Sequence, residues 1–60
     1  MKNFKIGDVV QLKSGGPKMT ISQEDVNSHG HFSGKIICEW FYDGDVKWHS
    51  FYEEELTLAS

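Results

Sequence analysis

Residues 35–52 read KIICEWFYDGDVKWHSFY and hold six of the eight aromatic side chains of this 60-residue chain. Near the middle stands Asp43-Gly44, a dipeptide that favours the two-residue turn of a β-hairpin because both turn positions need a positive φ. The flanking residues are rich in the aromatic and β-branched types that strands prefer. The stretch therefore predicts one aromatic-rich β-hairpin.

A two-residue turn also predicts which residues share a face of the hairpin, because side chains alternate along each strand. One face would carry Ile36, Cys38, Trp40, His49 and Phe51. The other would carry Ile37, Glu39, Phe41, Val46, Trp48 and Ser50. Both faces are substantially apolar, but a small β domain has one interior. A three-residue turn would change the register and could swap the two faces.

We expect the first face to supply the core residues Ile36, Cys38, Trp40 and Phe51. The second face would then leave an outer patch, which consists of Ile37, Phe41, Val46 and Trp48. The N-terminal lead-in or a polar loop would cover part of this outer patch. An exposed apolar patch of several hundred Å² often marks an interaction site.

The N-terminal half predicts two further strands. Residues 8–13 and 18–23 alternate apolar with polar side chains, as half-buried strands do, and the Ser-Gly-Gly-Pro turn at residues 14–17 separates them. Their core-facing residues would be Val10, Leu12, Met19 and Ile21. Phe4 and Ile6, in the lead-in, are expected to cover one end of the core.

The remaining segments complete an all-β layout. Glu24 to Ser33 predicts a polar loop about ten residues long, after which Gly34 opens the third strand. Glu53 to Glu55 is too short for an independent helix and predicts one 3-10 turn before a last strand, Leu56 to Leu58. Five short strands with this turn before the last predict a small SH3-like barrel, one domain spanning residues 1–60.

Composition narrows the classes of partner. The chain has six lysines, no arginine and nine acidic residues, for a net charge of −3. Nucleic-acid binders are usually basic, so this balance argues against nucleic acid and favours a basic peptide or protein. The alternative of a nucleic-acid-associated accessory protein would have to use Lys2, Lys5, Lys13, Lys18 and Lys35.

Size and the single cysteine give two more expectations. A 60-residue domain buries only about 60% of its unfolded surface, so a structural homodimer with no other ligand stays open as a third reading. The N-terminus lacks the apolar run of about 7–15 residues of a signal peptide, and no segment approaches the about 20 apolar residues of a membrane span. With Cys38 as the only thiol, these features predict a cytoplasmic protein.

Residue types that could bind a metal ion or act in catalysis do not form a recognisable site. His29, His31, Cys38 and His49 are ligand types that zinc prefers, but the spacing is unlike a zinc finger and there is no CxxC. Cys38 and His49 are formally a nucleophile and a base, which Asp43 or Asp45 could orient, yet nothing indicates a pocket or an oxyanion hole. We expect no enzyme activity, no metal site and no cofactor.

A family resemblance covers nearly the whole chain. FKIGDVVQLKSGGPKMTI at residues 4–21, together with Gly34, the run Cys38-x-Trp40-Phe41, Phe51 and Leu56, resembles the small bacterial YodC-like proteins. That family is a domain of unknown function. The resemblance implies the all-β, SH3-like fold, brings no catalytic residues and leaves the function open.

The sequence thus predicts a non-enzymatic interaction module that binds a protein or peptide through the hairpin. The expected contact residues are Phe41, Trp48, Glu39, Val46 and Tyr42, with the polar loop from Glu24 to Ser33 at the rim. Trp and Tyr are favoured at interaction hot spots. Glu39 beside Trp48 would suit an aromatic cage for a cationic ligand. The alternative is that these rings complete the core or bury each other across the hairpin.

Overall fold

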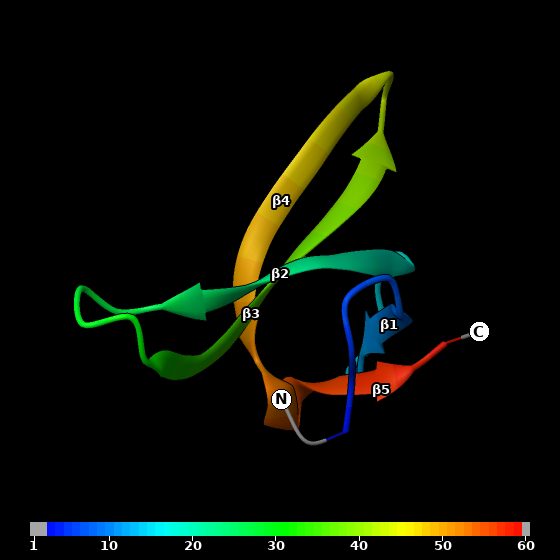
Figure 1. Ribbon diagram of the computed structural model, residues 1–60. Helices are drawn as coiled ribbons and strands as arrows, with labels where there is room; N and C mark the ends of the chain where they lie inside the picture. The colour runs from blue at the N-terminus through cyan, green and yellow to red at the C-terminus, as the bar shows by residue number, and fades with distance from the viewer. Residues whose placement is uncertain (1–2, 60) are drawn as a thin grey trace.

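The computed structural model describes residues 3–59, which form one five-stranded antiparallel sheet. Its elements are β1 (Val9–Leu12), β2 (Met19–Val26), β3 (Phe32–Tyr42), β4 (Asp45–Tyr52), the 3-10 helix η1 (Glu53–Glu55) and β5 (Leu56–Leu58). The strand order is β4-β3-β2-β1-β5 (Figure 1), so β4 and β5 are edges and the sheet does not close on itself. The predicted five strands and 3-10 turn are confirmed, whereas a closed barrel is not. No helix within residues 3–59 has the length and apolar character needed to cross a bilayer.

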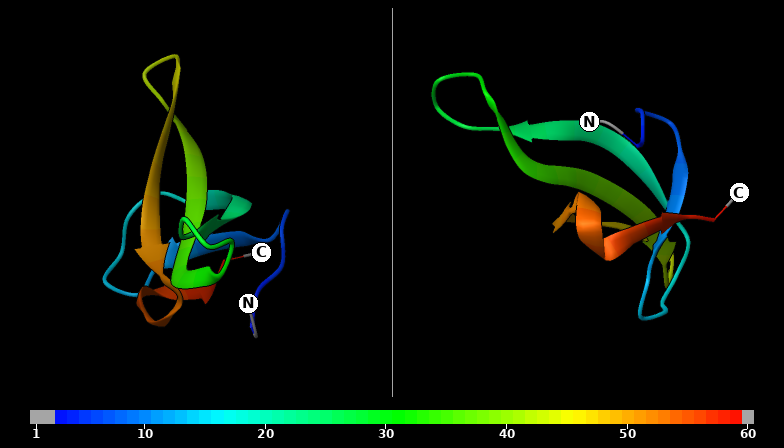
Figure 2. Two further views of the ribbon diagram at one scale, coloured as in Figure 1. Left: turned by 60° about the vertical axis from the view of Figure 1, so that its left-hand side comes forward. Right: turned by 90° about the horizontal axis from the view of Figure 1, so that it is seen from below.

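The sheet is strongly coiled, and the core lies on its inner face (Figure 2). The buried core residues are Val10, Met19, Ile21, Ile36, Cys38 and Leu56. Partly buried apolar side chains pack around them: Phe4, Leu12, Phe32, Trp40 and Phe51. These residues alternate along each strand with exposed or half-buried ones, as the period of two in a strand requires. The predicted core face of the hairpin is therefore correct.

The hairpin of β3 and β4 has the predicted register along its whole length. Its pairs run from Lys35 opposite Tyr52 to Tyr42 opposite Asp45. The two turn residues have the positive φ angles of a type I′ turn, 52° at Asp43 and 83° at Gly44. In Figure 1 the tip of this hairpin projects beyond the other strands.

The segment between β2 and β3 is shorter than the predicted ten-residue loop. β2 continues to Val26, which pairs with Phe32 at the start of β3, so only residues 27–31 connect the strands. The side-chain oxygen of Asn27 accepts hydrogen bonds from the backbone N–H groups of His29 (2.9 Å) and His31 (3.1 Å). The prediction of a loop from Glu24 to Ser33 was wrong because polar side chains on an exposed two-stranded ribbon give no apolar alternation.

A β-bulge at Ser22 changes which residues of β2 face outward. Ile21 lies opposite Cys38 while Gln23 lies opposite Ile37, which leaves Ser22 as the extra residue. The Ser22 hydroxyl donates a hydrogen bond of 3.1 Å to the carbonyl oxygen of Ile37. Without the bulge, strict alternation would point Gln23 to the same face as Ile21. The bulge therefore keeps an amide side chain out of the core.

The lead-in contributes one core residue rather than the two predicted. Phe4 packs against the core, but Ile6 is 60% exposed. Ile6 lies in a tight turn in which the N–H of Asp8 donates to the carbonyl of Lys5 (3.0 Å) and the Asp8 carboxylate accepts from the N–H of Lys5 (3.0 Å). This local turn directs the Ile6 side chain to solvent.

Candidate interaction surface

The outer patch is exposed at the end of the hairpin. Phe41 is 72% exposed, Val46 57% and Trp48 64%, while Ile37 is half-buried. Neither the lead-in nor the loop at residues 27–31 covers these three large side chains. The expected partial cover of the outer patch is therefore absent from the described part of the chain.

The exposure follows from the different lengths of the strands. The first residue of β2 that pairs with β3 is Thr20, opposite Glu39. Residues 40–42 of β3 therefore pair with β4 alone, and the tip is a two-stranded ribbon. Such a ribbon has no neighbouring strand whose side chains could flank Phe41 and Val46, which therefore stay in water. Trp48 lies opposite Glu39, below the two-stranded tip, on the edge strand β4.

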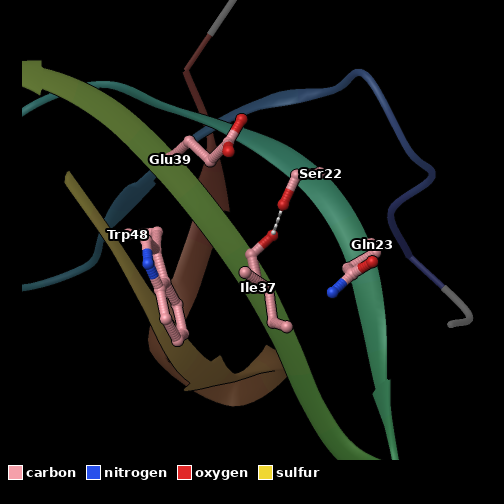
Figure 3. A pocket seen from close by; sticks show the side chains of 5 residues that line it. All are labelled: Ser22, Gln23, Ile37, Glu39 and Trp48. Carbon is pink, nitrogen blue, oxygen red and sulfur yellow. Dashed lines mark hydrogen bonds between the residues drawn. The ribbon is translucent and has the colours of Figure 1, made fainter. Parts of the chain in front are cut away.

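A shallow hollow of about 280 Å³ lies on the same face, below the tip (Figure 3). It is lined by Ser22 and Gln23 from β2, Ile37 and Glu39 from β3, and Trp48 from β4. Figure 3 shows the Trp48 indole beside the Ile37 side chain, with Glu39 on the same side of the sheet. The hollow combines an aromatic wall, an aliphatic floor and one carboxylate.

The structure brings four of the five predicted contact residues onto one face. Phe41 lies opposite Val46, and Glu39 lies opposite Trp48. Tyr42 is also exposed, at 65%, but it is adjacent to Phe41 in β3 and so lies on the opposite face of the ribbon. Tyr42 is therefore separate from the outer patch.

Sequence reasoning missed the β2 side of the hollow. Ser22 and Gln23 form its rim, in place of the predicted polar loop at residues 24–33. The signal in the sequence was the consecutive polar residues after Ile21, which break the alternation of β2. A bulge is one way in which a strand accommodates such a break.

The lysines of the nucleic-acid alternative come from different segments. Lys35 lies with its Nζ 5.0 Å from the centroid of the Tyr52 ring, a cation–π contact. Lys13 borders a second hollow, of about 290 Å³, together with Asn3, Phe4, Glu53, Glu54 and Leu56. That second hollow carries charges of both signs. Lys2 lies outside the described residues.

The histidines and the cysteine do not converge. Within residues 3–59, no three His, Cys, Asp or Glu side chains lie close enough to hold a metal ion. Cys38 is buried, and desolvation raises the pKa of its thiol to about 11. His49, its cross-strand neighbour, is exposed, and the ring of His49 lies 5.1 Å from that of Phe51. The Cys38 thiol is thus protonated at neutral pH, in an apolar environment.

A comparison with known protein families matches most of the chain. The sequence profile of an uncharacterized small protein family, DUF2158, matches residues 5–56. The chain belongs to the DUF2158 family. The YodC-like proteins, which the sequence resembles, are members of DUF2158, so that prediction is confirmed. No curated protein and no solved structure gives a significant match. The matched range of the DUF2158 profile contains the outer patch and every residue that lines the hollow beside Trp48.

Proposed function

We propose that this member of DUF2158 is a non-enzymatic interaction module that binds a protein or peptide partner through the outer patch. The observation that carries the proposal is the exposure of Phe41, Val46 and Trp48 on one face of a projecting hairpin. Large aromatic side chains in water are unfavourable, and their removal from water is the main driving force of association. A partner that covers this face would bury them.

The arrangement of strands supports a relationship to SH3-like barrels. Five strands, a 3-10 turn before the last strand and the pairing of β1 with β5 are features expected of that architecture. We infer an SH3-like topology in which the long β3–β4 hairpin leaves the sheet open. The hairpin would then be the segment specialised for binding.

The test is capture of a partner from the lysate of the cells that make the protein. Immobilised wild type and Trp48→Ala are compared, with Tyr42→Ala as the matched control because Tyr42 is equally exposed on the opposite face of the ribbon. We expect the partner to be retained by wild type and by Tyr42→Ala and lost from Trp48→Ala. Retention by a folded Trp48→Ala variant would exclude the outer patch as the binding site.

One observation favours a second candidate, a homodimer. β4 is an edge strand directly beside the outer patch, and an unpaired edge can pair with the same strand of a second copy. Such a dimer would join the sheets of the two copies and bury Trp48 of each copy at the interface. Its test is the oligomeric state in solution.

A further inference from the structure

We propose that the hollow beside Trp48 receives a lysine or arginine side chain from a basic, extended peptide segment of the partner. The inference rests on the proposed function and names the chemistry of the partner. Its basis is the combination of side chains in the hollow: the Trp48 indole, the Ile37 aliphatic chain and the Glu39 carboxylate.

The hairpin register brings the indole and the carboxylate together. The type I′ turn closes with a hydrogen bond between Tyr42 and Asp45, and hydrogen-bonded pairs then alternate with non-hydrogen-bonded ones along the ladder. Glu39 and Trp48 form a non-hydrogen-bonded pair, in which the Cα atoms are only about 4.5 Å apart and the side chains are closest. Figure 3 shows the Glu39 carboxylate directed toward β2 and the indole on the β4 side, so a cation in the hollow would lie between them.

The hollow suits both parts of a basic side chain. The methylene stem of lysine or arginine packs on apolar surface while its charged head stays in contact with water. Ile37 and the Trp48 ring supply that apolar surface, and Glu39 supplies the counter-charge. Within residues 3–59, the carboxylate of Glu39 makes no hydrogen bond or ion pair, so it is available to an incoming cation.

The same face of the sheet already holds one cation against a ring. Lys35 lies over Tyr52, and this pair stands four residues along each strand from the pair of Glu39 and Trp48. At Trp48 the cross-strand neighbour is a carboxylate, so the cation has to come from outside the chain. Lys35 is about 13 Å away along the strand, beyond the Debye length of about 8 Å at physiological salt, and repels that cation only weakly.

Charge around the outer patch selects against the other occupants. Glu39 lies on the outer patch and Asp43 lies in the turn beside it, whereas Asp45 and Lys47, with charges of opposite sign, both lie on the other face of the ribbon. A nucleic acid would bring phosphates toward these carboxylates. A second copy in a two-fold contact would bring the carboxylates of Glu39 and Asp43 toward their own copies. A basic peptide is attracted by them.

The experiment is selection from a displayed library of random peptides on the immobilised wild-type protein. The best peptide is synthesised with its conserved lysine or arginine and again with norleucine, which keeps the apolar stem and removes the charge. Dissociation constants are measured for both peptides on wild type, Glu39→Gln and Trp48→Ala. Glu54→Gln is the matched charge control, because Glu54 is an exposed carboxylate on η1. Circular dichroism checks that each variant is folded.

We expect every selected peptide to carry a lysine or arginine at one position, and norleucine there to weaken binding to wild type about tenfold. On Glu39→Gln the same replacement should change binding by less than about threefold, whereas Glu54→Gln should behave as wild type. Trp48→Ala should lose binding of both peptides.

The outcomes separate the two proposals. Equal affinity for the lysine and norleucine peptides, with loss of both on Trp48→Ala, would overturn the cationic ligand and leave the outer patch as a binding site. Selected peptides with acidic or purely apolar sequences would do the same. Failure to select any peptide whose binding needs Trp48 would overturn the basic peptide, and the capture test with Trp48→Ala would then decide the outer patch.

Discussion

Trp40 and Trp48 belong to the same hairpin but have different surroundings. Trp40 is half-buried, with its ring centroid 6.4 Å from that of Phe51. Trp48 is opposite Glu39 and exposed to water. The parity of each residue relative to the Asp43-Gly44 turn decides this difference, because side chains alternate along the strand. One tryptophan therefore contributes to stability and the other is available for binding.

Cys38 is buried because of its position in the strand, and this burial makes the unfolding free energy depend on pH. The pKa of its thiol is raised from the ordinary 9.0 to about 11 in the folded protein, because burial disfavours the thiolate. A raised pKa stabilises the fold fully below pH 9, and this stabilisation is lost as the pH rises from about 9 to about 11. We expect wild type to lose up to about 2 kcal/mol of unfolding free energy in this window relative to Cys38→Ala.

Urea unfolding at each pH measures that difference. Lysine and tyrosine titrations are common to both proteins and cancel in the comparison. Parallel stability profiles for wild type and Cys38→Ala between pH 9 and 11 would contradict the burial of a neutral thiol.

The β3–β4 hairpin depends on its two-residue turn. Gly44 has a φ of 83°, and a Cβ added there would meet no atom within 4 Å. The cost of Gly44→Ala is therefore confined to the backbone, about 1–2 kcal/mol for a residue with a left-handed conformation. Asp43→Asn is the matched control, because asparagine is also favoured at the first position of a type I′ turn.

We expect urea unfolding to show that loss for Gly44→Ala and wild-type stability for Asp43→Asn. The weaker turn should also speed amide hydrogen exchange in residues 40–47, which pair across the tip. A Gly44→Ala protein as stable as wild type, with unchanged exchange at the tip, would show that the turn does not hold the register.

The elements differ in how far the sequence determined them. Asp43-Gly44 was enough for the full register of the hairpin, because a two-residue turn leaves one pairing. The ends of β2 and β3 could not be predicted, since Val26 and Phe32 are held by a local network around Asn27 among polar residues. The bulge at Ser22 was not predicted either, because it depends on the tertiary structure: it turns the Gln23 side chain away from the core. The sequence therefore predicted the outer patch but not Ser22 and Gln23, which form the rim of the hollow beside it.

At the scale of the whole molecule, the core and the outer patch are separate. The six buried apolar residues of the described chain come from β1, β2, β3 and β5. Phe41, Val46 and Trp48 belong to none of that packing, so their truncation removes little buried surface. A surface substitution of this kind usually changes stability by no more than about 0.5 kcal/mol. Variants of the outer patch should therefore fold, which makes them usable in binding tests.

The oligomeric state follows from size and charge together. A standard interface takes about 800 Å² from each partner, close to a fifth of the 4261 Å² surface of this chain. A two-fold contact of that size around the outer patch would include Glu39 and Asp43 and bring like charges together. We expect light scattering after size exclusion to give a monomer across a concentration series at moderate salt. A wild-type dimer that Trp48→Ala converts into a folded monomer would assign the outer patch to self-association and exclude a basic peptide as its main occupant.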